Sequence, residues 1–281
     1  MRLGRAYPSK LKDIMMEYEG LILEKKGHVA ILTMNRPHRL NALTAEISNE
    51  LLPGIFREVQ EDDAVRALII TGAGKGFCTG ADIVLFNQAA EEGKLQETLE
   101  PRGETIGGAF VLGLYNLEKP VIAAVNGVAA GGGVSIALLS DIRIASEKAV
   151  FNLAFVMRGL IPDCGCTFLM PRLLGTGRCY EYMYTGDSID AHEAERIGLV
   201  NRVVPHEKLM EEAEALAARI VQGPPLALKQ IKRAVQNGML NNLEQQLYFE
   251  TYAQKFLMGS EDFREGLDSF RHKRLPKFKG R

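Results

Sequence analysis

Apolar residues occur in short runs and in helical spacing along the first two thirds of the chain. Residues 17–34 predict two strands joined by a turn at 25–27, because aliphatic and β-branched residues flank a Lys-Lys-Gly sequence. Thr44 predicts the N-cap of a helix that extends to about Gln60, with apolar side chains every three or four residues. The chain is therefore expected to begin with two strands and a helix.

The next part repeats a unit made of a strand, a glycine-rich loop and a helix. In chain order the segments are 65–71, 72–80 and a helix from Ala81, then 120–125, 126–131 and 132–139. A further pair of strands, at 142–145 and 150–153, precedes a helix at about 168–174. Repeated strand-then-helix units of this kind predict an α/β core.

Helical spacing dominates the last part of the chain. Three helices are predicted there, at 209–220, 225–237 and 243–257. We divide the chain into three parts: an N-terminal tail at 1–16, an α/β core at 17–204 and a C-terminal helical region at 205–281. The tail is basic but lacks the apolar segment of a secretory signal. The C-terminal region is either a satellite domain or an oligomerisation arm.

Composition excludes several classes of function. The chain has 34 Lys and Arg against 35 Asp and Glu, so no overall charge attracts it to nucleic acid or anionic lipid. Residues 120–140 carry no charge, but their four glycines and Asn126 favour a buried strand, loop and helix over a membrane span. Cys164-x-Cys166 lacks the second ligand pair of a zinc site, and four cysteines are too few for a disulfide scaffold. We expect a cytoplasmic protein without metal, membrane or nucleic-acid partners.

The two glycine loops are candidate cradles for an anion or an oxyanion. Glycine lets backbone N–H groups approach a ligand without obstruction by Cβ, and the helix that follows adds positive potential. Neither loop contains the P-loop pattern or G-x-G-x-x-G, which disfavours nucleotide phosphate. Gly133-Val134-Ser135-Ile136-Ala137 lacks the last glycine of a nucleophile elbow.

Several motifs identify a family when they are taken in order. They are Asn35-Arg36-Pro37, Leu-Asn-Ala-Leu at 40–43, residues 74–82, residues 119–127 and the three glycines at 131–133. In this order they resemble the enoyl-CoA hydratase/isomerase (crotonase) family, and the resemblance extends from about Glu19 to Lys277. It implies a spiral of ββα units and a C-terminal helical trimerisation region. It also implies a homotrimer or homohexamer.

The resemblance also implies an acyl-CoA thioester substrate, with no separate cofactor because CoA is part of the substrate. The family's oxyanion hole falls on the backbone N–H groups of Ala81 and Gly132, each expected at the start of a helix. Two fixed donors stabilise a thioester enolate more than the neutral carbonyl, which lowers the barrier to removal of the neighbouring proton.

Further residues are expected along the path of the CoA moiety. By resemblance they are Arg39, Leu40, Ala42, Gly80, Asp82 and Ile83. Arg39 either pairs with a CoA phosphate or is a solvated loop arginine. Asp82 is expected to cap the following helix rather than to take part in catalysis.

The resemblance favours an isomerase over a hydratase. Hydratases of this family use two glutamates to activate water, and their positions correspond here to Ser135 and Phe155. Adding water to a double bond needs an acid and a base near one water molecule, so the loss of both carboxylates disfavours hydration. The segment Ile161-Pro162-Asp163 is similar to that of family isomerases, including the epoxyphenylacetyl-CoA isomerase group, in which the aspartate is the base.

Asp163 has two interpretations. As a proton shuttle, it would move a proton between two carbons of an acyl chain, and the apolar residues Phe155, Ile161 and Phe168 would raise its pKa. As a structural residue, it would be the N-cap of a helix that begins before Thr167.

The leading hypothesis is an acyl-CoA isomerase that moves a double bond from the β,γ to the α,β position or catalyses a related rearrangement. Within the family, a hydratase that uses Asp163 and a second group is the main alternative, and a hydrolase or decarboxylase would use the same oxyanion hole. Outside this chemistry, the chain would be a non-catalytic acyl-CoA-binding protein or a nucleotide-phosphate protein.

Overall fold

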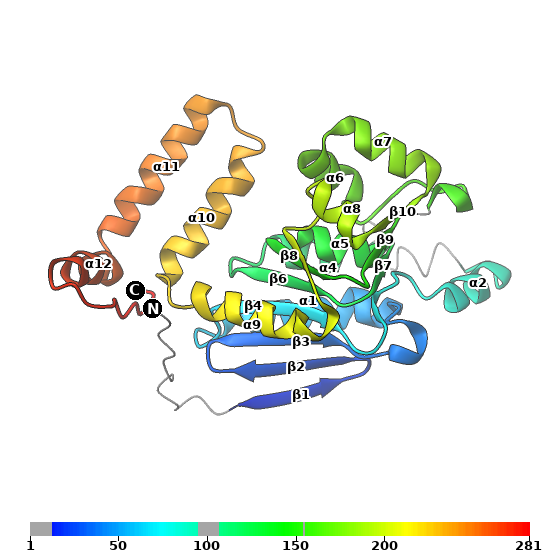
Figure 1. Cartoon of the computed structure of the whole chain (residues 1–281), viewed down its shortest axis with the longest axis horizontal. Helices are drawn as coiled ribbons and strands as arrows, with labels where there is room; N and C mark the ends of the chain where they lie inside the picture. The colour runs from blue at the N-terminus through cyan, green and yellow to red at the C-terminus, as the bar shows by residue number, and fades with distance from the viewer. Residues whose placement is uncertain (1–12, 95–106, 154) are drawn as a thin grey trace.

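The computed structural model describes residues 13–94, 107–153 and 155–281 and shows strands in two sheets with helices around them (Figure 1). The strands are β1 Ile14–Tyr18, β2 Leu21–Lys26, β3 Val29–Met34, β4 Ala67–Gly72, β5 Gly76–Cys78, β6 Val121–Val125, β7 Val128–Ala130, β8 Ile142–Ser146, β9 Val150–Asn152, β10 Ser188–Asp190 and β11 Arg202–Val204. The larger sheet has the order β1-β2-β3-β4-β6-β8-β11, and the smaller has the order β10-β9-β7-β5.

Helices cover both sheets and form the end of the chain. They are α1 Leu52–Glu61, α2 Ile83–Glu91, α4 Gly108–Tyr115, α5 Gly132–Leu139, α6 Cys166–Leu174, α7 Thr176–Thr185, α8 Ala191–Arg196, α9 Leu209–Ile220, α10 Pro225–Gly238, α11 Leu243–Met258 and α12 Glu261–Arg271. Short helical turns are η1 Pro37–Arg39, η2 Ile47–Leu51, η3 Val156–Arg158 and η4 His206–Lys208. Thr44 is the N-cap of the helical segment that includes η2 and α1. Its hydroxyl accepts a hydrogen bond from the Ile47 N–H at 3.1 Å. That prediction is confirmed.

The central strands of the larger sheet are parallel and buried on both faces. In β4, Leu68 and Ile70 pack into the main core, whereas Ile69 points to the other face and packs with α9 through Ala213 and Ala217. Side chains alternate between the faces of a strand, so a strand covered on both sides is apolar throughout. This explains the uninterrupted apolar run that predicted the strand.

The repeating unit is one strand in each sheet followed by a helix. The units are β4-β5-α2, β6-β7-α5 and β8-β9-α6, with β4, β6 and β8 in the larger sheet and β5, β7 and β9 in the smaller one. Each predicted glycine loop therefore contains a short strand, β5 or β7, and these two strands pair in parallel. The pairing holds the two loops side by side. The strands predicted at 142–145 and 150–153 belong to different sheets.

Some boundaries differ from the predictions. β1 begins at Ile14, inside the segment assigned to the tail, and pairs with β2, so residues 17–34 take part in three strands rather than two. Ile14 and Met15 are 50% and 63% exposed, and an exposed edge strand leaves little pattern in the sequence. The helix after the first glycine loop begins at Ile83 rather than at Ala81.

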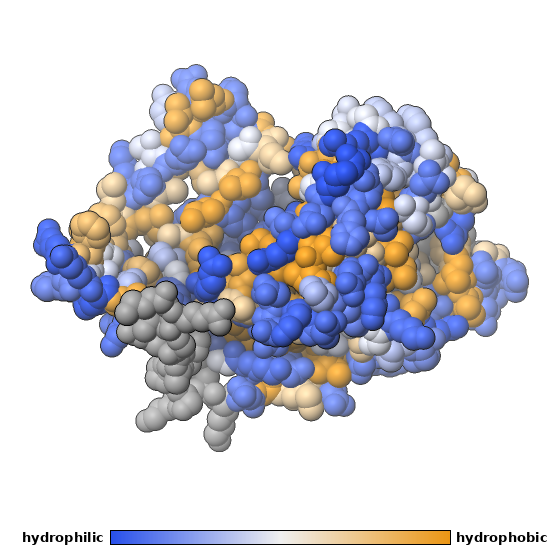
Figure 2. Space-filling model, viewed as in Figure 1, coloured by the Kyte–Doolittle hydropathy of each residue, from blue (hydrophilic) through white to orange (hydrophobic). Residues whose placement is uncertain are grey.

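Helices α10 and α11 extend away from the sheets (Figure 1) and expose many apolar side chains, which Figure 2 shows over these two helices. Those more than half exposed include Ile231, Val235, Leu243, Leu247, Tyr252 and Phe256. Large contiguous apolar surfaces are rare on monomers and usually mark an interface. No helix in the described ranges combines the length and apolar character that a membrane crossing needs.

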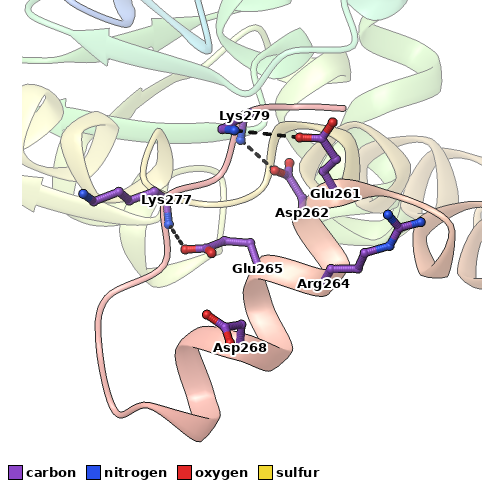
Figure 3. A pocket seen from close by; sticks show the side chains of 7 residues that line it. All are labelled: Glu261, Asp262, Arg264, Glu265, Asp268, Lys277 and Lys279. Atoms are coloured by element: carbon purple, nitrogen blue, oxygen red, sulfur yellow. Dashed lines mark hydrogen bonds and ion pairs between the residues drawn. The ribbon is translucent and has the colours of Figure 1, made fainter.

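The end of the chain folds back onto α12 (Figure 3). Asp262 is 4% exposed, and its carboxylate accepts backbone hydrogen bonds from Lys279 and Gly280 at 2.6 and 2.8 Å. Glu265 accepts the Lys277 N–H at 2.7 Å. A carboxylate that accepts two backbone N–H groups forms strong, charge-assisted bonds. These bonds fix the terminal segment against the first turns of α12.

Candidate active site

The two glycine loops touch at Gly80 and Gly132. A Cβ atom on Gly80 would lie 2.8 Å from the Gly132 nitrogen and 2.8 Å from the Ala130 oxygen, closer than real Cβ atoms approach. Gly80 also has a φ of +75°, in the left-handed region that favours glycine. Only glycine therefore allows this approach of the two loops.

The backbone at Ala81 pairs with Leu43 in such a way that the Ala81 N–H points away from Leu43. Leu43 donates its N–H to Gly80 O at 2.7 Å and accepts the Asp82 N–H at 3.0 Å, as in a parallel ladder that brackets Ala81. In such a ladder the bracketed residue directs its own N–H to the opposite side. Within the described ranges, the Ala81 N–H donates to no protein acceptor.

The Gly132 N–H is open for a different reason. Gly132 is the first residue of α5, and the first N–H groups of a helix have no partner inside the helix. No acceptor in the described part of the chain receives it. Gly132 is buried and Ala81 is exposed. Both residues were predicted to lie at the start of a helix. This is confirmed for Gly132, whereas Ala81 lies just before the N-cap of α2.

Two asparagines that sequence reasoning missed hold the first glycine loop in place. Asn41 donates to the carbonyls of Ala73 and Gly76 at 2.9 and 2.7 Å. Asn126 donates to the carbonyls of Gly74 and Gly76 at 3.0 and 3.1 Å. Both asparagines are buried, so these bonds satisfy polar groups that water cannot reach. Asn126 directly precedes a glycine in the sequence, which was an available signal, whereas Asn41 lies far along the chain from the loop that it holds and offers no such signal.

Asp82 is the N-cap of α2, and its buried carboxylate is also the centre of a charge cluster. It accepts the Val84 N–H at 3.2 Å, so the expected capping role is confirmed. Arg36 lies 3.1 Å and Arg39 3.6 Å from its two carboxylate oxygens. Burial alone would raise the pKa of Asp82, but the Arg36 hydrogen bond and the Arg39 charge hold it below its ordinary value. Sequence reasoning named Arg39 and missed Arg36.

The other predicted CoA-path residues lie around the same loop. Leu40 and Ile83 are 41% and 47% exposed, whereas Ala42 is buried. A Cβ on Gly76 would meet Leu40 atoms at 3.1 to 3.3 Å, so η1 packs directly on the first glycine loop. The structure therefore brings these residues together with Gly80 and Asp82.

The Asp163 carboxyl is partly buried and caps no helix. The N-cap of α6 is Gly165, and no side chain caps that helix, so the N-cap interpretation of Asp163 is wrong. Burial raises the pKa of the Asp163 carboxyl, although a hydrogen bond with the Cys164 side chain opposes the rise. Ile161 is 78% exposed and so does not account for that burial, contrary to prediction.

The segment that carries Asp163 lies close to the second glycine loop. A Cβ on Gly107 would meet both the Cys164 Sγ, at 2.6 Å, and the Phe110 ring, at 2.8 Å. The same Phe110 ring would lie 3.8 Å from a Cβ on Gly132. A short series of contacts thus joins the Asp163 segment to the N-terminus of α5.

The two positions expected to hold hydratase glutamates carry no acid. Ser135 is fully buried in α5, and its Oγ lies 3.1 Å from the Cys166 Sγ. The Phe155 ring would lie 3.6 Å from a Cβ on Gly131, so an aromatic ring lies against the end of the second glycine loop. The described residues contain no cluster of His, Cys, Asp and Glu that could hold a metal ion.

Two N–H groups without a protein acceptor in the described ranges therefore lie on two loops in contact, and the partly buried carboxyl of Asp163 lies on a segment that side-chain contacts join to one of them. The sequence model of the enoyl-CoA hydratase/isomerase family matches residues 24–281. The chain therefore belongs to the enoyl-CoA hydratase/isomerase family of enzymes, which act on acyl-CoA substrates.

Known relatives carry names for different reactions. A 1,2-epoxyphenylacetyl-CoA isomerase from Escherichia coli strain K12 is 39% identical over 95% of this chain and 100% of its own length. A short-chain-enoyl-CoA hydratase from Clostridium acetobutylicum is 42% identical over the same shares. The crystal structure of an enoyl-CoA hydratase from Bacillus anthracis matches with a TM-score of 0.85 at 34% identity, covering 93% of this chain and 100% of that one. The expected crotonase-like fold is confirmed.

Proposed function

We propose that this enzyme is an acyl-CoA isomerase that moves a double bond from the β,γ to the α,β position or catalyses a related rearrangement. The observation that carries the proposal is the Asp163 carboxyl, which is partly buried and caps no helix. Ser135 and Phe155, which cannot act as acids or bases in water addition, stand at the hydratase positions. One carboxyl is enough for a proton shuttle.

The reaction has two proton transfers. Asp163 takes a proton from the α-carbon, the C–H electron pair forms a double bond to the thioester carbon, and the carbonyl pair moves onto oxygen. Protonated Asp163 then gives the proton to the γ-carbon, which binds it with the electron pair of the β,γ double bond. The pair between the thioester carbon and the α-carbon becomes the α,β double bond, and the oxygen pair restores the carbonyl. A raised pKa suits this carboxyl, because it must both accept and return the proton.

The Ala81 and Gly132 N–H groups stabilise the dienolate oxygen between these steps. They are open donors on two loops in contact, which supports this role. Each such donor lowers the barrier by about 3–4 kcal/mol when charge develops on the oxygen. Phe155, which lies over Gly131, helps to exclude water from the intermediate.

Arg39, Leu40, Ala42, Gly80, Asp82 and Ile83 form the path of the CoA moiety in this proposal. Arg36 neutralises Asp82 at 3.1 Å, while Arg39 is 3.6 Å from the same carboxylate and is 38% exposed. The guanidinium of Arg39 is therefore available to a CoA phosphate, whereas that of Arg36 is already paired with Asp82. No separate cofactor is needed, because CoA belongs to the substrate.

We also propose that the enzyme is a homotrimer or homohexamer assembled through the C-terminal helices. The support is the series of exposed apolar side chains on α10 and α11, such as Leu243 at 77% and Tyr252 at 73% exposure. Burying such side chains against a second copy contributes about 25 cal/mol for each Å² removed from water.

Hydration remains the alternative, favoured by the 42% identity to a short-chain-enoyl-CoA hydratase. The test offers the purified enzyme a β,γ-enoyl-CoA and, separately, crotonyl-CoA, and identifies the products by mass spectrometry. The proposal predicts α,β-enoyl-CoA from the first substrate and little 3-hydroxyacyl-CoA from the second. Rapid hydration of crotonyl-CoA without isomerisation would reverse the assignment. Tight CoA binding with no turnover of either substrate would indicate a non-catalytic acyl-CoA-binding protein.

A further inference from the structure

Helix α10 meets the core through polar side chains. Lys232 is buried, and its Nζ donates to a carboxylate oxygen of Asp141 at 3.0 Å and to the Lys119 carbonyl at 3.1 Å. One turn further along the helix, Gln236 donates to the Tyr115 carbonyl at 2.9 Å. Lysine is rarely buried unless a charged or polar partner receives it, and Asp141 is that partner here. These bonds fix α10 to the core.

Asp141 joins the two ends of the segment that contains the second glycine loop. Its carboxylate accepts the Val121 N–H at 2.7 Å, and its own N–H donates to the Val121 carbonyl at 3.0 Å. Val121 is the first residue of β6, and Asp141 comes shortly after the last residue of α5, the helix that begins at Gly132. One carboxylate oxygen, Oδ2, receives both the Val121 N–H and the Lys232 ammonium. Lys232 therefore neutralises the carboxylate that closes this segment.

Gln236 holds a second element that borders Gly132. Tyr115 is the last residue of α4, and Phe110 lies in the same helix. The Phe110 ring would lie 3.8 Å from a Cβ on Gly132. Helix α10 thus contacts both α4, which packs beside Gly132, and the far end of the helix that Gly132 begins.

We propose that Lys232 is a positioning residue that, through Asp141 and α5, sets the place of the Gly132 N–H in the active site. This inference rests on the proposed role of that N–H as an oxyanion donor. Helix α5 has eight residues and is about 12 Å long, so a displacement at its Asp141 end is carried along a rigid element to the N–H at its beginning. A misplaced donor weakens the binding of the transition state more than that of the substrate, so kcat should fall while KM changes little.

A neighbouring ion pair on α10 provides the matched control. Lys229 and Arg233 both pair with the Glu118 carboxylate. Lys229→Met removes a charge from the same helix but leaves Glu118 paired with Arg233. In the part of the chain that the structure describes, no second cation pairs with Asp141, so Lys232→Met leaves that carboxylate without a charged partner.

The experiment compares wild type with Lys232→Met, Lys232→Arg and Lys229→Met. Turnover is measured with a β,γ-enoyl-CoA and with crotonyl-CoA, because isomerisation and hydration both place negative charge on the thioester oxygen. In Lys232→Met, kcat is expected to fall about 10- to 100-fold, with KM within about twofold of the wild-type value. Lys232→Arg, which keeps the charge, should recover part of the loss, and Lys229→Met should keep the wild-type kcat. A wild-type kcat in folded Lys232→Met would overturn the inference.

Amide hydrogen exchange separates this result from a failure of the proposed function. Exchange in α4 and α5 is followed by mass spectrometry without substrate. Both helices should exchange faster in Lys232→Met than in wild type, whereas Lys229→Met should match wild type. Unchanged exchange in Lys232→Met would overturn the inference even if the wild-type enzyme converted neither substrate. Lys232→Gln, which keeps a polar side chain, replaces the methionine variant if that variant does not fold, and the same changes in kcat and exchange are expected.

Discussion

Gly80→Ala tests whether the close approach of the two glycine loops builds the active site. The added Cβ would lie 2.8 Å from the Gly132 nitrogen and 2.8 Å from the Ala130 oxygen, so the loops must separate. The displaced atoms include the nitrogen of one proposed oxyanion donor. A shift of this kind acts on catalysis without changing any side chain that contacts the substrate.

Three costs are expected from this substitution, two in folding free energy and one in catalysis. An alanine at a φ of +75° loses about 1–2 kcal/mol of folding free energy through its left-handed conformation. The collision adds about 1–3 kcal/mol, as overpacking does elsewhere in proteins. Misplacing the Gly132 donor raises the barrier by up to about 3–4 kcal/mol, which corresponds to a loss in kcat of roughly 10² to 10³.

Gly27→Ala is the matched control. Gly27 also has a positive φ, +58°, but no atom lies within 4 Å of its Cβ position, so the variant carries the strain without the collision. Urea unfolding and the rate of β,γ-enoyl-CoA isomerisation are measured for both variants. Both should lose stability, and only Gly80→Ala should lose activity. The reasoning is refuted if Gly80→Ala keeps the wild-type kcat, or if Gly27→Ala loses as much of it.

The remaining predictions concern pH, a buried ion pair and assembly. Because the base must be deprotonated and burial raises the pKa of Asp163, kcat/KM should rise with pH through that pKa, and a flat profile in the acid range would contradict this. Because burial raises the pKa of Asp163, the folded state binds the carboxyl proton more tightly than the unfolded chain does. The contribution of Asp163 to the free energy of unfolding should therefore fall as the pH rises above the pKa of this carboxyl in the unfolded chain. The urea midpoint of Asp163→Asn should lack this fall. Asp82→Asn should lower the free energy of unfolding, measured with urea, by about 3 kcal/mol, because it leaves Arg36 without its charged partner. The Arg36 side chain is only 17% exposed. A loss below about 0.5 kcal/mol would show that the ion pair is unimportant for stability. Tyr252→Glu on α11 should shift the sedimentation coefficient from an oligomer to a monomer, and an unchanged coefficient would argue against assembly through this face.

Sequence patterns predicted elements best where local signals and burial agree. The helix expected at 132–139 is α5, and the helix expected at 209–220 is α9, with the same bounds. Glycines precede the first, and the second has a clear apolar face toward the sheet. The strands β5 and β7 were missed because three residues inside a glycine-rich segment show no periodicity. They form only because the two segments pair with each other.

Only part of the candidate site could be predicted, because some of its contacts depend on how distant segments pack together. The motif order located Ala81, Gly132 and Asp163, but only the structure shows that Gly80 touches Gly132 and that Asp163 caps no helix. Local sequence cannot show that Arg36 reaches Asp82, since the two are brought together by the fold.

Asp163→Asn in deuterated water shows whether one carboxyl shuttles the proton. Exchange of α-protons and double-bond migration in β,γ-enoyl-CoA are followed by NMR, with Asp187→Asn, an exposed aspartate, as the control. If Asp163 is the only base, Asp163→Asn loses both activities by a factor of roughly 10² to 10⁴, whereas the control keeps them. Undiminished exchange and migration in Asp163→Asn would contradict this role.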